Sequence, residues 1–142
     1  MSQVTRNIAA IFRCGGQYRN QQLEPMGLSA RQASFLLEIC ETPGISQDTL
    51  ARRLFLNKSV IARQLATLEE EGFVERIPCQ KDKRIVRLHP TGKTRELLPR
   101  IRAVWTDWEE YLTRDMTQTE VEALEGLLGR LKARAAEWME AD

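Results

Sequence analysis

The sequence predicts a mainly α-helical protein with one small β-hairpin. Apolar residues recur every three to four positions through most of the 142-residue chain, which is the period of helices that bury one face. Two short β-branched segments, FVERI at 73–77 and RIVRL at 84–88, are separated by PCQKDK. Proline and aspartate favour a turn between them. The two segments therefore predict a two-stranded hairpin.

Recognisable end signals divide the first part of the chain into two helices. A helix-compatible segment covers residues 3–22, and PMG at 25–27 ends it. Ser29 is placed to cap the next helix, because a serine hydroxyl accepts a hydrogen bond from a free N–H of the first turn. TPG at 42–44 ends that second helix.

Two more helices follow, separated by about three residues. Ser46 is placed to cap the first, SQDTLARRL, and Asn57 the second, which is expected from Lys58 to Glu71 with Gly72 ending it. The inward face of the second helix holds Ile61, Leu65 and Leu68. This spacing is that of a helix-turn-helix.

The hairpin leads into further helix. Pro90 is expected in the first turn of a long helix that runs to about Arg114. Thr117 or Thr119 is placed to cap a last helix. The order helix, helix, short turn, helix, basic hairpin is that of a winged helix-turn-helix, with the hairpin as the wing.

Positive charge gathers in the middle of the chain, although the formal net charge is only +1. Residues 52–95 hold 11 Lys or Arg and 5 Asp or Glu, whereas residues 96–142 hold 6 and 11. A basic segment joined to an acidic one is typical of a DNA-contacting surface attached to another module. The same charges also fit an ordinary solvated surface.

Composition and motifs exclude other classes of protein. No apolar run approaches the roughly 20 residues of a membrane span, and the N-terminus lacks the pattern of a signal peptide, so we expect a cytoplasmic protein. Three widely spaced cysteines do not suggest a disulfide framework. With a single histidine, no metal-ligand spacing and no phosphate-binding glycine loop, we expect no catalytic residue, no metal and no cofactor.

The second helix of a helix-turn-helix lies in the major groove of DNA, and its N-terminal residues contact base edges. Its exposed side here offers a mixture of phosphate-binding and base-reading residues: Lys58, Ser59, Val60, Ala62, Arg63 and Gln64. The tip of the wing places Lys81, Lys83 and Arg84 beside the phosphate backbone or in the minor groove. These residues are the predicted DNA-binding site.

The segment ISQDTLARRLFLNKSVIARQLATLEEEGFVERIPCQKDKRIVRLHPTGK carries a family resemblance. It contains L-A-x-x-L, then a helix ending L-E-x-x-G-[FL]-[VI]-x-R, then D-x-R. The matching landmarks are Leu50, Ala51, Leu54, Arg63, Leu68, Glu69, Gly72, Arg76, Asp82, Arg84, Leu88 and Gly92. Residues 28–95 thereby resemble the DNA-binding core of the MarR family of multiple-antibiotic-resistance regulators.

The resemblance implies a role for the wing pair. In the family, the wing aspartate and arginine interact and the arginine reaches DNA; by position these are Asp82 and Arg84. The other interpretation of Asp82 is a plain turn aspartate. His89 departs from the family, which has threonine there, and histidine caps the following helix less naturally.

The resemblance also implies a domain organisation. We expect one MarR-type domain over residues 1–142, with a winged helix-turn-helix lobe at 28–95 and helical dimerisation regions at 1–24 and 91–142. The flanking helices carry Trp105, Trp108 and Trp138, more apolar surface than one small lobe covers. A homodimer that reads a pseudo-palindrome is expected; an intramolecular helical hairpin is the alternative.

The family responds to small phenolic or anionic ligands or to oxidants. On the first helix, Arg13, Tyr18 and Arg19 offer such a ligand polar groups, although all three also fit a plain surface. Cys14 or Cys79 would be the thiol of a redox response, and an incidental surface thiol is the alternative for each.

The predicted function is a sequence-specific regulator of transcription that binds double-stranded DNA and is released by a small ligand or oxidant, with repression the commoner outcome in the family. The alternative function is a winged-helix adaptor that binds protein rather than an operator. The excess of positive charge in residues 52–95 counts against the adaptor.

Overall fold

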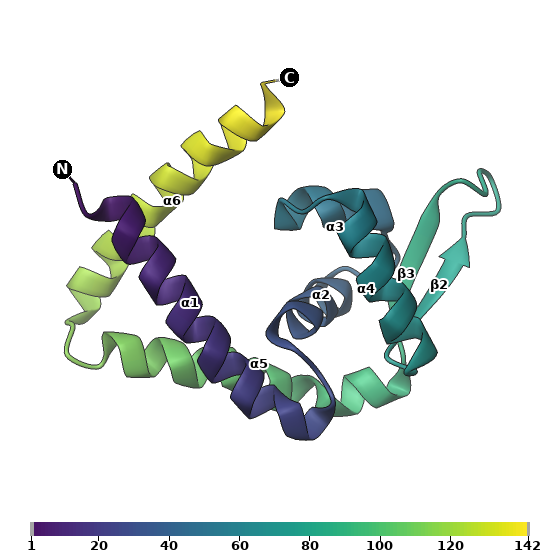
Figure 1. Cartoon of the computed structure of the whole chain (residues 1–142), viewed down its shortest axis with the longest axis horizontal. Coiled ribbons are helices and arrows are strands. Elements are labelled where there is room, and N and C mark those ends of the chain that lie inside the picture. Colours follow the sequence, from purple (N-terminus) through teal and green to yellow (C-terminus); the bar gives the residue numbers. More distant parts are fainter. Residues whose placement is uncertain (1, 142) are drawn as a thin grey trace. The chain divides into compact units, whose positions relative to one another are not determined.

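Figure 1 shows the computed structural model of the chain, in which residues 2–141 are described. The elements are α1 (Val4–Leu23), a 3₁₀ turn η1 (Glu24–Met26), α2 (Ala30–Glu41), β1 (Ile45–Ser46), α3 (Gln47–Leu54), α4 (Lys58–Glu70), β2 (Val74–Pro78), β3 (Val86–Pro90), α5 (Gly92–Thr113) and α6 (Gln118–Glu140). The predicted fold class, mainly α with a β-hairpin wing, is confirmed. The chain forms two compact units, one up to Thr106 and one from Asp107.

The predicted helix starts agree with hydrogen bonds of the caps. The Ser29 hydroxyl accepts from the N–H of Gln32, whose side chain accepts from the N–H of Ser29 in return. Ser46 and Asn57 cap α3 and α4 through their side-chain oxygens. Of the two candidates for the last helix, Thr117 is the cap, and it forms the same reciprocal box with Glu120. Each cap satisfies N–H groups that a helix leaves unpaired at its start.

The sheet differs from the prediction in two respects. It has three antiparallel strands in the order β1-β3-β2, because the two residues of β1 pair with β3, Ile45 opposite Leu88. Pro90 was expected in the first turn of the following helix, and this is wrong. It ends β3 opposite Val74, and α5 begins at Gly92.

The start of α5 explains how the chain accommodates His89. Thr91, not residue 89, lies at the helix start: its hydroxyl accepts from the N–H of Thr94 at 3.4 Å and donates to the Gly72 carbonyl at 2.6 Å. The buried Thr94 hydroxyl donates to the Phe73 carbonyl at 2.6 Å. The two threonines therefore tie the start of α5 to the base of the wing.

The apolar core of the first unit fixes the orientation of α4. Ile61, Leu65 and Leu68 are each 0% exposed, as the sequence predicted for the inward face. They pack in one cluster with residues from α2, α3, the wing strands and α5, among them Phe35, Leu36, Ile39, Leu50, Phe73, Leu88 and Ile101. In Figure 1 the hairpin extends beyond α4, and its loop projects away from the helices.

Candidate nucleic-acid interface

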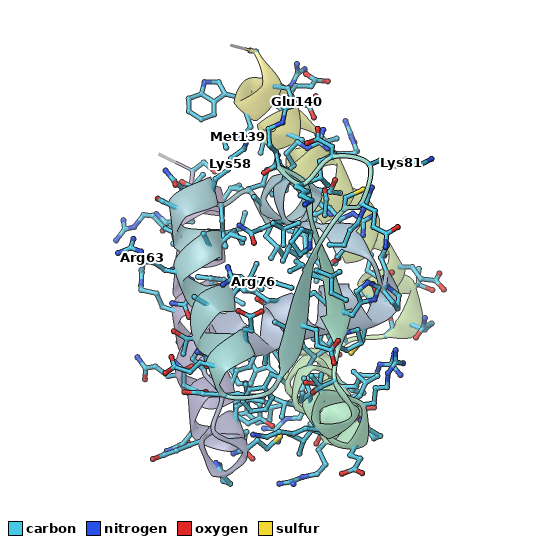
Figure 2. The ribbon with its side chains drawn as sticks, turned by 90° about the vertical axis from the view of Figure 1, so that its right-hand side faces the viewer. Lys58, Arg63, Arg76, Lys81, Met139 and Glu140 are labelled. Atoms are coloured by element: carbon cyan, nitrogen blue, oxygen red, sulfur yellow. The ribbon has the colours of Figure 1, made fainter. Side chains whose placement is uncertain are left out.

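The outward face of α4 carries the residues that the sequence predicted there. Lys58, Ser59 and Arg63 are exposed, whereas Val60, Ala62 and Gln64 are half-buried. Figure 2 shows Lys58 at the start of α4 and Arg63 projecting outward from the helix. Because the opposite face is locked into the core, this polar face points to solvent, and α4 has the exposure that a recognition helix needs.

Most of these side chains have contacts within the protein. Lys58 Nζ lies 3.6 Å from Asp48 Oδ2. The Ser59 hydroxyl donates to Asn57 Oδ1 at 2.6 Å, and Gln64 Oε1 accepts from Gln32 Nε2 of α2 at 3.4 Å. The guanidinium of Arg63 has no hydrogen-bond or ion-pair partner among residues 2–141. Arg63 is therefore the cation of α4 that is most available to a ligand.

The wing tip holds an arginine in a fixed orientation. Arg84 Nε donates to Asp82 Oδ1 and Arg84 Nη2 donates to Asp82 Oδ2, each at 3.0 Å. The carboxylate also accepts from the Arg84 backbone N–H at 3.0 Å. This bidentate pairing fixes the orientation of the planar guanidinium, yet the Arg84 side chain stays 91% exposed. The predicted interaction of Asp82 with Arg84 is present.

The charges of this pair stabilise each other. Hydrogen bonds from the Arg84 side chain, and then from its backbone, lower the pKa of Asp82 below its ordinary value. The Asp82 carboxylate in turn raises the pKa of Arg84. Lys81 and Lys83 beside them are exposed. At neutral pH the wing tip therefore carries a net positive charge that one carboxylate offsets in part.

A second arginine sets the position of the wing relative to α4. Arg76 on β2 donates from Nη2 and Nε to Glu69 Oε1 on α4, at 3.0 and 3.2 Å. Figure 2 shows Arg76 lying between the helix and the hairpin. Both residues belong to the L-E-x-x-G-x-x-x-R motif, but the sequence did not reveal that they pair with each other. We call this ion pair, which links α4 to the wing, the Arg76–Glu69 strut.

The comparisons with known proteins agree with this geometry. Residues 26–85 match the model of the MarR family. An uncharacterized HTH-type transcriptional regulator of Bacillus subtilis (strain 168), YybA, is 30% identical over 132 residues, which cover 93% of this chain and 88% of the relative. The chain belongs to the MarR family. It is a winged-helix transcriptional regulator, and the named relatives are regulators of transcription rather than enzymes.

Solved structures of the MarR family share the whole fold. A crystal structure of MarR is 31% identical, with a TM-score of 0.88, covering 100% of this chain and 99% of that one. A MarR family regulator from Listeria monocytogenes, complexed with 26mer DNA, is 25% identical with a TM-score of 0.93, covering 98% and 93%. The family and the fold are thus established over nearly the full length of the chain.

The three residues predicted to bind a MarR-type effector line three different hollows. Arg13 lines a hollow with the first residues of α1, Tyr18 lines another with Leu28, and Arg19 lines a third. Only the third brings a cation to aromatic residues: the Arg19 guanidinium carbon lies 5.4 Å from the centre of the Trp105 ring. Burial lowers the pKa of Arg19. That hollow encloses about 480 Å³.

The cysteines are all free thiols, and they differ in environment. Burial raises the pKa of Cys40, as expected of a thiol beside the core. The backbone N–H groups of Asp82 and Lys81 lower the pKa of Cys79, at the base of the wing turn. Within residues 2–141, no three His, Cys, Asp or Glu side chains gather as a metal site. The helices of that range also lack the length and apolarity that crossing a membrane requires.

Proposed function

We propose that this MarR-family regulator binds a specific double-stranded operator and acts as a repressor. The observation that carries the proposal is the pairing of two exposed cationic elements: the outward face of α4, with Arg63, and the wing tip, with the Asp82–Arg84 fork. The Arg76–Glu69 strut sets these two elements at a fixed spacing. In this proposal α4 reads a major groove, and the wing tip contacts the adjacent backbone or minor groove.

The functional form is a homodimer that reads a pseudo-palindrome with half-sites about 10 bp apart. Its support is the large apolar side chains that one chain leaves exposed, including Phe12 (71%), Leu127 (56%) and Trp138 (78%). Exposed apolar patches of this size are typical of interaction surfaces. In this proposal residues 28–95 form the DNA-binding lobe, and residues 1–24 and 91–142 form the dimerisation region.

Release from the operator follows binding of a small ligand or an oxidant. The support for a ligand is the hollow beside Arg19, where the guanidinium faces the Trp105 ring and Phe12 and Leu54 line the wall. A flat aromatic anion would satisfy the cation and the apolar wall together. The support for an oxidant is the lowered pKa of Cys79, because the thiolate is the reactive form.

The test is selection of the operator from a pool of random duplexes, followed by measurement of its affinity for two variants. Arg63→Ala should lower affinity for the selected sequence by about 1–3 kcal/mol, because a bidentate contact to a base is lost. The matched control is Arg31→Ala, which removes an exposed arginine of α2 and should leave affinity unchanged.

Three outcomes would count against the proposal. Equal operator affinity of wild type and Arg63→Ala, with unchanged circular dichroism, would remove Arg63 from the site. Failure to enrich any sequence, together with binding that salt does not weaken, would favour the protein-binding adaptor instead. Release of the operator by neither aromatic anions nor peroxide would remove the proposed switch.

A further inference from the structure

A groove lies between the start of α3 and the base of the wing, and Arg84 is its one lining residue that belongs to the predicted site. The groove encloses about 360 Å³, room for about a dozen water molecules. Three exposed arginines line it: Arg52 from α3, Arg84 from the wing tip and Arg87 from β3. Arginines from three different segments thus converge on one small volume, although sequence spacing alone gives no reason to group them.

Each arginine is held within the protein but keeps unused donors. Arg52 Nη2 donates to Thr49 Oγ1 at 3.3 Å, and Arg87 Nη1 donates to the Gly44 carbonyl at 3.3 Å. Neither contact neutralises charge, because both acceptors are uncharged. Arg84 alone is paired with a carboxylate. A guanidinium has five N–H donors, so the groove presents several charge-assisted donors and at least two uncompensated positive charges.

The groove also holds one carboxylate and one unsatisfied polar atom. Asp48 lies at its rim, where Lys58 Nζ partly neutralises it at 3.6 Å. Gln47 Oε1 is buried and has no hydrogen-bond partner. A half-turn of that side-chain amide exchanges its oxygen for its NH₂ group, which would add a donor to the lining. An anion with several acceptor oxygens would accept hydrogen bonds from the unpaired N–H groups of the arginines and of Gln47.

The position of the groove indicates which anion arrives there. Asp48 at the rim contacts Lys58 at the start of α4, and Arg84 belongs to the wing tip. The groove therefore adjoins both elements that would enter grooves of DNA. If α4 lies in a major groove and the wing tip in the neighbouring minor groove, a strand of phosphates must cross the protein between them.

We propose that this groove binds one phosphate of that DNA strand, with Arg52 and Arg87 as its principal ligands. The inference rests on the proposed function, since it requires DNA to lie across α4 and the wing. The contact carries no sequence information, because it is made to the backbone. It fixes the register of the recognition helix and contributes equally to operator and non-operator binding.

The experiment measures affinity against salt concentration for the selected operator and for a scrambled duplex of equal length. The double variant Arg52→Ala/Arg87→Ala should bind both duplexes more weakly by the same factor. Its plot of log K against log salt should be shallower by about 1.8, because a dimer loses one phosphate contact in each of its two lobes and each contributes about 0.9. Arg52→Lys/Arg87→Lys should keep the slope, because charge is retained. Arg31→Ala should change neither quantity.

A variant that removes a negative charge from the groove, where the arginine variants remove positive charge, gives a second test. Asp48→Asn removes the carboxylate that lines the groove and should tighten binding to both duplexes by roughly threefold for each lobe, because the repulsion between one unit charge and a nearby phosphate is lost. Because this variant gains affinity, it keeps the proposal testable even if an arginine variant fails to fold. Unchanged or weaker binding by Asp48→Asn would overturn the proposal.

Two further outcomes separate this inference from the proposed function. If Arg63→Ala loses operator affinity while the arginine double variant keeps both affinity and slope, the groove proposal is overturned and the operator-binding function stands. The other arm titrates inorganic phosphate without DNA at constant ionic strength. Saturable binding of phosphate to wild type that the double variant lacks, together with unchanged DNA affinity and salt slope of that variant, would make the groove a site for a free anion and would overturn the backbone contact.

Discussion

The wing tip, residues 79–85, and the C-terminal unit, residues 107–142, are both exposed, but with opposite chemistry. The wing tip exposes Lys81, Lys83 and Arg84. The C-terminal unit exposes large apolar side chains: Tyr111, Leu112, Leu124, Leu127, Leu128, Leu131, Trp138 and Met139. In the single chain, α6 has no buried residue. The difference indicates which partner each region fits.

Exposed charge is favourably hydrated, whereas exposed apolar surface is not. A cationic tip without a bound polyanion has little free-energy penalty, because water solvates it fully. An apolar helix face of this extent has an unfavourable free energy in water until another surface covers it. The wing therefore suits transient binding to DNA, and the C-terminal unit suits a lasting association between chains. Four experiments test this difference between the two regions.

Salt should weaken DNA binding by the wing and leave association through the C-terminal unit unchanged. This is the largest expected effect. Lys58, Lys81, Lys83 and Arg84 together with the groove of Arg52 and Arg87 offer about five phosphate contacts per lobe, and thus about ten per dimer. Between 50 and 200 mM salt, operator affinity should then fall by about 10³ to 10⁵-fold. Sedimentation of the free dimer should stay the same, since apolar association is not screened. A dimer that dissociates as salt rises would contradict the apolar interpretation.

Leu112→Glu should break the apolar association. Leu112 is 44% exposed in the single chain, and in a dimer interface the new carboxylate would be buried without a partner. The dissociation constant of the dimer should rise by about a hundredfold or more. Glu110→Gln, two residues earlier on the exposed side of α5, is the matched control. Wild type sedimenting as a monomer at micromolar concentration would end the dimer proposal.

The wing pair should show an effect of about tenfold. Arg84→Ala removes one phosphate contact from each lobe of the dimer and should make the salt slope shallower by about 1.8. Asp82→Ala removes a negative charge, yet it should also weaken binding, because the carboxylate fixes the orientation of the Arg84 fork. The double variant should match Arg84→Ala alone. Tighter binding of a fluorescent operator by Asp82→Ala would leave the aspartate as a turn residue.

Removing a helix cap should give the smallest effect and should show how independent α6 is. Ser29 and Thr117 form the same capping box, at α2 and α6, and each change to alanine should cost about 1 kcal/mol. Ser29→Ala should lower the stability of the whole first unit. Thr117→Ala should speed hydrogen exchange only in the first turns of α6, and Thr119→Ala should change nothing. Loss of protection throughout the core in Thr117→Ala would show that α6 is coupled to it.

The sequence predicted the elements well because their ends carry strong local signals. Ser29, Ser46 and Asn57 were found as caps because a side-chain oxygen before an apolar repeat has one structural use. The choice between Thr117 and Thr119 could not be made in this way, since each has a glutamate three residues later, Glu120 and Glu122. Strand β1 was missed because two residues carry no period. Pro90 misled because proline is allowed at a helix start and equally at a strand end.

The candidate site was predictable only in part. The residues of α4 and the wing follow from one helix period and one motif. The grouping of Arg13, Tyr18 and Arg19 stays a prediction, and a helical period of about 100° per residue spreads them around α1. The convergence of Arg52 and Arg87 was beyond the sequence, because it depends on how β3 packs beside α3. Tertiary contacts, not local patterns, create such sites.

The exposed apolar face of the C-terminal unit makes the concentration of the chain itself a control on regulation. In the dimer that we propose, two chains must meet before either lobe finds its half-site. Below the dissociation constant of the dimer, mass action makes dimer concentration vary with the square of chain concentration, so a threefold dilution lowers it about ninefold. Operator occupancy then falls more steeply than protein level. Growth that dilutes the protein, or proteolysis of a modest fraction, would switch the promoter without any effector.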